Sequence, residues 1–320
     1  LAAVLYERHG VLAAALTIGS PIVVQMATIT YVDAALMLFV GAAFVCLDEH
    51  PAVAGFLLGT ACSVKYLGWY FAVAALLYVV MKKRFALAFV AAVLPMYTVI
   101  VALSGSPFFP FFGGGAWAMP WHEPVWPVRV LWDITFARQR VNFQPPYSPL
   151  FAVGMLIAIV RRHWIGALCL GYLAIFAFLP QDSRYLLPLV PLVSIVAAGV
   201  VPERWRRAAA IVAVAPAFAY AAFCLVRQGP PPITSAQRQA YIEKRVPEYR
   251  ALQQAGGKRV LLVCGAERLL YYGGRERGRD FDYVLIPKRP CDVKPEGTLV
   301  YADAAAELWR TERRSAMNAR

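Results

Sequence analysis

Apolar runs of roughly 13 to 19 residues recur along most of the chain, and short charged clusters separate them. A helix that crosses a bilayer needs about 20 mainly apolar residues, with about 17 to 25 tolerated. Hydrophobic residues make up 60% of the sequence and charged residues only 16%, against about 25% charged in ordinary soluble domains. The mean hydropathy is +0.54. The sequence therefore predicts a polytopic α-helical membrane protein.

The apolar runs predict about nine spans. The third run, 52–64, is the weakest candidate, and it could merge with the fourth into one bent element. Such a merger would move Lys82-Lys83-Arg84 to the opposite side from the other basic clusters, so nine is the better count. The expected spans are 11–28, 31–47, 52–64, 67–81, 85–103, 148–160, 164–179, 185–201 and 208–226.

Charged clusters fall at every second junction between these runs. Lys and Arg dominate most of them, which marks that side as cytoplasmic. Because the net charge of +13 is partly held there, we expect no nucleic-acid partner. The clusters are Glu7-Arg8-His9, Asp48-Glu49-His50, Lys82-Lys83-Arg84, Arg161-Arg162-His163 and Glu203 to Arg207. The alternate junctions are expected outside a bacterial inner membrane or in an organelle lumen.

Two domains are expected. Residues 1–229 form the membrane domain, whose outer loop 104–146 is rich in tryptophan and includes an amphipathic stretch at 128–141. Pro230-Pro-Pro232 then leads into a small α/β domain at 230–320, placed outside the membrane. This domain is expected to hold a helix over 237–254, short helices at 266–272 and 304–313, and a mainly parallel sheet. Cys264 and Cys291 are candidates for a disulfide there.

Three ionisable residues stand in apolar surroundings on the expected outer side: Asp33, Lys65 and Arg184. Each has an alternative explanation. Asp33 could simply favour a helix N-terminus, Lys65 could extend to the lipid headgroups, and Arg184 could contact headgroups or bridge a loop. Together, a Lys and an Arg suit an anionic ligand such as phosphate. Asp182 would orient Arg184 or cap the following helix. No Cys or His spacing indicates a metal, and the cofactor requirement stays open.

Four short motifs give the chain a family resemblance: Tyr31-Val-Asp33, the stretch from Gly59 to Lys65-Tyr66, the Phe/Pro-rich stretch from Ser106, and Ser183-Arg-Tyr-Leu-Leu-Pro-Leu-Val-Pro191. Nearly the whole chain resembles the GT-C superfamily of membrane glycosyltransferases. The resemblance is to the bacterial branch related to protein O-mannosyltransferases and the lipid A aminoarabinose transferase.

The resemblance implies inverting transfer of a sugar from a polyprenyl-phosphate donor to a lipid, glycan or protein acceptor at the outer membrane face. Lys65 and Arg184 match the basic residues that handle the phosphate, with Tyr66, Asp182 and Tyr185 beside them. Asp33 matches an acidic residue near the catalytic cavity. The acidic loop expected after a first span, which would activate the acceptor, has no counterpart before residue 11. We therefore expect the chain to be truncated at its N-terminus.

Two other classes of function remain open. A transporter or flippase-like permease would show paired repeats and interrupted helices near the midplane, whereas here the polar groups gather at one face. A non-catalytic membrane assembly protein would use the soluble tail to bind a partner. The fold alone does not decide between these classes.

Overall fold

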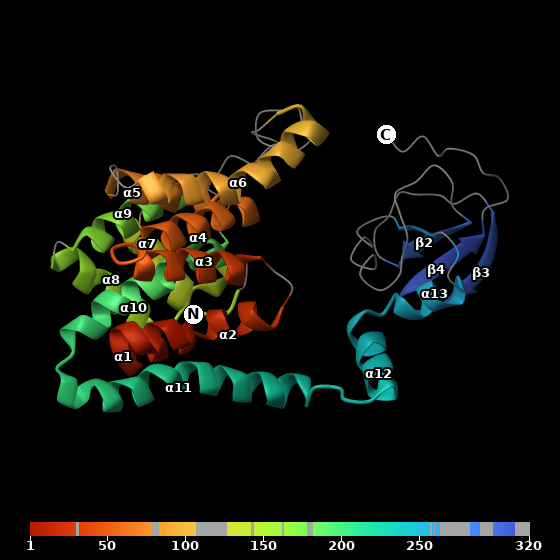
Figure 1. The fold of residues 1–320 in the computed structure, drawn as a ribbon. Coiled ribbons are helices and arrows are strands. Elements are labelled where there is room, and N and C mark those ends of the chain that lie inside the picture. The colour runs from red at the N-terminus through yellow and green to blue at the C-terminus, as the bar shows by residue number, and fades with distance from the viewer. Residues whose placement is uncertain are drawn as a thin grey trace. The chain divides into compact units, whose positions relative to one another are not determined.

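A computed structural model describes residues 1–29, 32–78, 83–106, 127–141, 144–161, 163–177, 182–256, 258, 260–262, 282–288 and 297–310. The chain divides into two compact units, Leu1–Gln228 and Gly229–Arg320. The described residues are mostly helical, with 13 α-helices and one small sheet. All four strands belong to the second unit (Figure 1).

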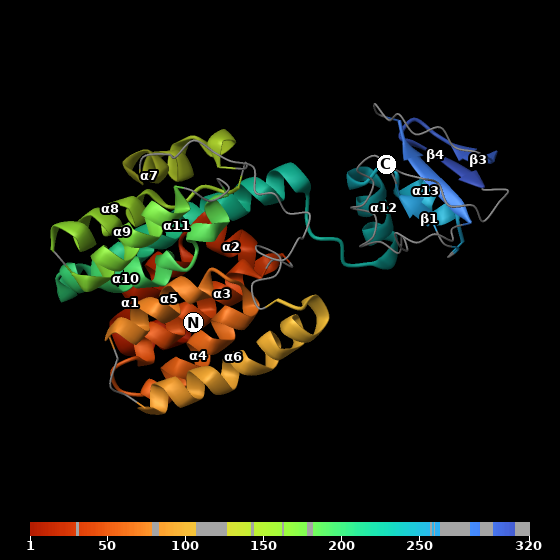
Figure 2. The same cartoon turned by 90° about the horizontal axis from the view of Figure 1, so that it is seen from above.

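Each apolar run of the first unit contains at least one helix. Figures 1 and 2 show these helices packed side by side, with α6 and α11 running in the same direction along the bundle. The helices are α1 (Ala2–Ile18), α2 (Pro21–Thr28), α3 (Asp33–Cys46), α4 (Pro51–Val64), α5 (Gly68–Tyr78), α6 (Lys83–Ser104), α7 (Pro127–Phe136), α8 (Pro149–Val160), α9 (Trp164–Phe176), α10 (Leu189–Val200) and α11 (Glu203–Gln228).

Two described helices, α6 and α11, are long and apolar enough to cross a membrane alone. The bent pairs α1–α2 and α8–α9 raise the number to four if each pair counts as one span. Helices α3, α4 and α10 have 14, 14 and 12 residues, so each covers about 20 Å, less than the roughly 30 Å of a hydrocarbon core. Two to four candidate spans are therefore observed, and the count of nine stays a prediction.

The first expected span, 11–28, is not one straight helix. Helix α1 begins nine residues earlier, at Ala2, and contains a kink at Gly10, whose φ of 82° suits glycine. The chain then turns by 84° between α1 and α2. Ser20 is extended there, and Pro21 occupies the first turn of α2. Proline fits a first helical turn and disfavours helical geometry at the residue before it, which agrees with the extended Ser20.

Helices α3 and α4 are joined by a short turn at 47–50. Two glycines let α4 approach α6 closely. A Cβ at Gly59 would lie 2.5 Å from the carbonyl oxygen of Phe89, and one at Gly55 would collide with the carbonyl of Phe85. Small residues four positions apart permit such close packing between helices in a membrane. Exposed leucine, valine and methionine side chains of α6 cover the rest of its surface.

The amphipathic stretch expected at 128–141 is a helix over most of its length. Helix α7 buries Val130, Leu131 and Ile134, while Trp132 and Phe136 are exposed on the opposite side. Their ring centroids are 4.6 Å apart. This alternation gives α7 one face toward the protein and one aromatic face away from it.

The second unit begins with two helices where one was expected. Thr234 and Gln237 form a capping box at the start of α12 (Ser235–Arg245). Pro247 follows, and Val246 before it leaves helical geometry, as residues preceding proline tend to do. Helix α13 (Tyr249–Gln254) then completes the segment.

The sheet has strand order β1-β2-β4-β3 and is mixed, not mainly parallel. Its strands are β1 (Val260–Leu262), β2 (Tyr283–Pro287), β3 (Thr298–Ala302) and β4 (Ala306–Arg310). Only β1 and β2 pair in parallel; β4 pairs antiparallel with both β2 and β3.

The helix expected near 304–313 is wrong, because residues 306–310 form β4. Ala306 and Leu308 are buried, while Glu307 and Trp309 alternate with them on the less buried side, and this period of two fits a strand. Asp303 accepts hydrogen bonds from the amides of Ala305 and Ala306 and thereby forms the turn into β4. The disulfide candidates Cys264 and Cys291 lie outside the described residues, as do the short helix expected at 266–272 and residues 107–126 of the tryptophan-rich loop.

Candidate functional site

Asp33 and Lys65 are placed at the same end of the α3–α4 hairpin. Asp33 is the first residue of α3, and Lys65 is the C-cap of α4. Each position suits its charge, because a helix N-terminus favours an anion and a C-terminus favours a cation. Lys65 itself is extended, which ends α4 before α5 begins at Gly68.

Arg184 comes from a different part of the chain, the 3₁₀ turn η2 (Ser183–Leu186) that precedes α10. The side chain of Asp182 accepts a hydrogen bond from the Arg184 amide and thereby caps the turn. Helix α10 packs closely on α3, since a Cβ at Gly41 would lie 2.8 Å from Cγ of Pro191. This contact joins α3, which carries Asp33, to the segment that carries Arg184.

Four charged side chains form the cluster, which we call the charge cluster: Asp33, Lys65, Asp182 and Arg184. Lys65 Nζ lies 2.5 Å from Asp33 Oδ1. Arg184 Nε lies 2.7 Å from Asp182 Oδ2 and 4.0 Å from Asp33 Oδ2. The Asp33 carboxylate is therefore shared between two cations that come from separate elements.

The carboxylates and the cations of the charge cluster differ in exposure. The side chains of Asp33 and Asp182 are 3% and 6% exposed, whereas those of Lys65 and Arg184 are 23% and 19% exposed. The two carboxylates thus lie deeper in the protein, and the two cations are closer to its surface. Partly exposed cations in front of buried carboxylates can bind an anion without losing their internal partners.

Two tyrosines were also expected at this site. The ring of Tyr185 lies against both cations, with its centroid 4.1 Å from Lys65 Nζ and 5.6 Å from Arg184 Cζ. Such cation–π contacts stabilise a positive charge that has lost part of its hydration. The ring of Tyr66 instead packs edge-on against Tyr97 of α6, at 6.2 Å between centroids. The structure thus places the Tyr185 ring against the charge cluster, whereas the Tyr66 ring packs against α6.

Two further tyrosines support the site and were not singled out from the sequence. Tyr147 and Tyr172 are buried, and their hydroxyls donate to the carbonyl oxygens of Ser183 and Tyr185, each at 2.8 Å. A buried tyrosine usually finds a partner for its hydroxyl. That rule indicates that such a partner exists, but it does not identify the carbonyl from the sequence.

A second group of charges lies at the opposite end of the α3–α4 hairpin. Arg8 of α1 forms an ion pair with Glu49 in the turn after α3. Two of the charged clusters that were expected on one side are therefore in contact. Their side chains are 40% and 60% exposed, so water surrounds this pair, unlike the charge cluster.

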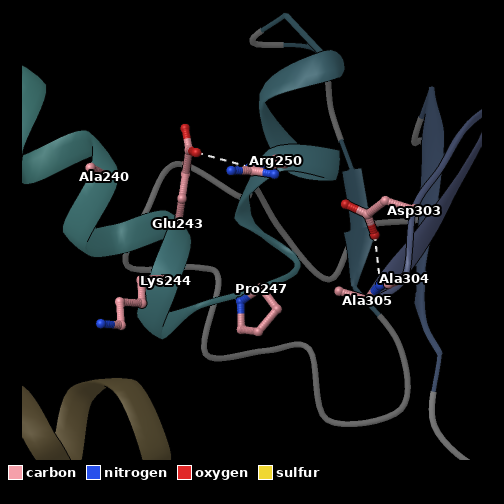
Figure 3. Close-up of a pocket in the computed structure, with 8 residues that line it drawn as sticks. All are labelled: Ala240, Glu243, Lys244, Pro247, Arg250, Asp303, Ala304 and Ala305. Carbon is pink, nitrogen blue, oxygen red and sulfur yellow. Dashed lines mark hydrogen bonds and ion pairs between the residues drawn. The ribbon is translucent and has the colours of Figure 1, made fainter.

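The second unit contains a cavity of about 540 Å³ between α12, α13 and the turn before β4. Figure 3 shows Glu243 directed toward Arg250, and Asp303 beside Ala305. Glu243 binds Arg250 and Gln239, and Asp303 binds Tyr301 as well as the two amides of its turn. These acidic groups hold the unit together, because their hydrogen bonds run within it.

Among the described residues, no group of three or more His, Cys, Asp or Glu side chains could hold a metal ion. Comparison with protein-family models, curated proteins and solved structures finds no match to this chain. The arrangement of the site therefore carries the functional argument.

Proposed function

We propose that the chain belongs to a glycosyltransferase of the GT-C type, which moves a sugar from a polyprenyl-phosphate donor to a lipid, glycan or protein acceptor. The observation that carries the proposal is the charge cluster, in which Lys65 and Arg184 converge on Asp33 from separate elements. Polar groups of this kind are costly within an apolar helical bundle and commonly mark a functional site.

The proposed chemistry depends on the two cations. In an inverting displacement, the bond between the sugar and the carrier phosphate breaks as the acceptor attacks. Negative charge therefore grows on the phosphate of the carrier. Preorganised cations in a site with little water stabilise that charge more in the transition state than in the ground state. Arg184 can offer two N–H groups to phosphate oxygens, and Lys65 provides a point charge. Asp33 orients both cations or the acceptor.

The proposed location is a bacterial inner membrane, which the chain crosses nine times. In this topology the charge cluster lies at the outer surface, and the second unit lies outside the membrane. The contact between Arg8 and Glu49 supports this arrangement, because it joins two junction clusters expected in the cytoplasm. Asp33 and Lys65 lie at the other end of α3 and α4. Reporter fusions at Lys83 and Gly256 test the sidedness, and a report of the same side for both would contradict it.

The direct test is turnover of a polyprenyl-phosphate sugar by the full-length protein in proteoliposomes. Arg184→Ala is expected to lower turnover by roughly 10²-fold, the scale of losing one oxyanion-type donor. Arg184→Lys is expected to restore only part, because the planar fork is lost. Arg8→Ala is the matched control, since it removes an arginine from the opposite end. Unchanged transfer by a correctly inserted Arg184→Ala protein would exclude the proposal.

The same assay separates the other classes of function. A transporter or flippase would move the lipid-linked sugar across the vesicle membrane without breaking the glycosidic bond. A non-catalytic assembly protein would do neither. Either outcome would exclude transfer by this chain.

A further inference from the structure

The two residues on either side of Arg184 are held by hydrogen bonds from outside their own turn. The Tyr147 hydroxyl donates to the carbonyl of Ser183, and the Tyr172 hydroxyl donates to the carbonyl of Tyr185. Both distances are 2.8 Å. The backbone is therefore fixed immediately before and immediately after the arginine.

The two tyrosines come from different elements. Tyr147 precedes α8, and its own amide donates to the Ile134 carbonyl of α7 at 3.0 Å. Tyr172 lies in the middle of α9, and its ring packs against Phe71 of α5 with 4.9 Å between centroids. Because both rings are buried, the two hydroxyls form fixed points of attachment for η2.

The turn η2 needs such support. It has four residues in 3₁₀ geometry, whose hydrogen bonds are poorer than those of an α-helix. Within it, Asp182 and Arg184 bond to their near neighbours. These local bonds shape the turn but do not fix its position against the bundle. The tyrosine hydroxyls attach it to α9 and to the segment before α8, beside the approach of Arg184 to Asp33 of α3.

We propose that Tyr147 and Tyr172 are positioning residues that hold Arg184 in the orientation needed to bind a phosphate group. The inference rests on the proposed role of Arg184 as a phosphate ligand. Neither hydroxyl contacts the phosphate, because each is committed to a backbone carbonyl. Their effect on binding passes through the direction in which the Arg184 side chain leaves the backbone.

The test uses Tyr147→Phe and Tyr172→Phe, which keep the buried ring and remove only the hydroxyl. Binding of farnesyl phosphate is titrated by calorimetry in nanodiscs, with farnesol as the ligand that lacks a phosphate. Each variant is expected to bind farnesyl phosphate about tenfold more weakly, which corresponds to one lost hydrogen bond to a buried carbonyl. Farnesol binding should not change.

Tyr70→Phe is the matched control. The Tyr70 hydroxyl also donates to a backbone carbonyl, that of Leu168 in α9, at 2.5 Å. Its ring even contacts the ring of Tyr172, at 5.1 Å between centroids. This bond does not touch the turn that carries Arg184, so the control should leave phosphate affinity unchanged. Equal weakening by Tyr70→Phe would overturn the proposal.

A double-mutant cycle separates positioning from general stability. In an Arg184→Ala background, Tyr147→Phe and Tyr172→Phe should no longer affect farnesyl phosphate binding, because the group that they position is absent. A purely structural role would weaken binding to the same extent in both backgrounds and would overturn the proposal. Tyr172→4-aminophenylalanine, which restores a donor, should recover binding if the variant with Phe is too unstable to titrate. Failure of that rescue in a folded protein would also overturn it.

The cycle also distinguishes an error in the proposed phosphate site from an error in the proposed role of the two tyrosines. If Arg184→Ala alone leaves farnesyl phosphate binding unchanged, the proposed phosphate site is wrong. If Arg184→Ala weakens binding while both tyrosine variants bind normally, the site stands and the positioning role is wrong.

Discussion

The two ends of the α3–α4 hairpin carry ion pairs of opposite character. At one end, Arg8 and Glu49 meet with 40% and 60% of their side chains exposed. At the other end, Lys65 binds an Asp33 side chain that is only 3% exposed, and Arg184 and Asp182 complete the charge cluster. The same kinds of residue are thus placed once in water and once within the protein.

The difference in exposure bears on how much each group of charges contributes to stability. An exposed ion pair loses little hydration and contributes little to stability. A buried one must first be stripped of water, and its mutual attraction often no more than offsets that cost. Stability alone would therefore not explain four charges between apolar helices, whereas binding of an anionic ligand would.

The largest expected effect is at Asp33. Asp33→Ala removes the carboxylate that Lys65 binds and that Arg184 approaches, so the free energy of unfolding should fall by about 3–5 kcal/mol. Denaturant unfolding in mixed micelles measures this loss. Asp33→Ala combined with Lys65→Met restores the balance of charge and should lose less than the single variant. A double variant less stable than Asp33→Ala would contradict the account of a buried, mutually neutralised cluster.

An intermediate effect is expected at Asp303 in the second unit. Burial favours the neutral carboxyl, but hydrogen bonds from the amides of Ala305 and Ala306 and from Tyr301 outweigh it and lower the pKa of Asp303. Asp303→Asn keeps one oxygen for the two amides but replaces the oxygen that accepts from Tyr301, so it should cost about 1 kcal/mol at neutral pH, the usual value of one hydrogen bond.

The pH dependence of this difference follows from the lowered pKa. The stabilisation is fully present above the pKa of Asp303 in the unfolded chain and is lost as the pH falls through the lower folded value. Hydrogen exchange of the β3–β4 amides in the two proteins, compared at each pH, should therefore converge in acid. A difference in exchange protection between the two proteins that grew as the pH fell would contradict the lowered pKa of Asp303.

The smallest effect is expected at the exposed end. Arg8→Ala and Glu49→Ala should leave the unfolding midpoint close to that of the unaltered protein, because water replaces the lost partner. The same unfolding assay serves for these variants and for Asp33→Ala. Losses at Arg8 comparable to those at Asp33 would remove the contrast between the two ends.

Much of the helical architecture could be predicted from the sequence, because apolar runs bounded by charges leave few alternatives to helices. The position of Lys65 beside Asp33 and Arg184 followed from counting junctions, since alternate junctions lie at one end of a bundle. The 84° turn before Pro21 did not follow. Proline in a first helical turn is equally compatible with a straight approach and a sharp one.

Other features depend on contacts between distant residues. The stretch 304–310 contains helix-favouring alanines, yet the pairing of β4 with both β2 and β3 overrides that propensity. The hydroxyls of Tyr147 and Tyr172 find their carbonyls 36 and 13 residues away. No local pattern encodes those partners, so the support for Arg184 became visible only in the folded chain.

The most direct measurement is titration of the protein with farnesyl phosphate, comparing Lys65→Ala and Arg184→Ala with Arg8→Ala. Inorganic phosphate and farnesol, titrated separately, show whether the headgroup alone or the chain alone accounts for binding. The account predicts that both substitutions in the charge cluster weaken farnesyl phosphate binding at least tenfold, while Arg8→Ala binds normally. Equal affinity in all three variants, each verified as folded, would contradict the claim that the charge cluster is a phosphate-binding site.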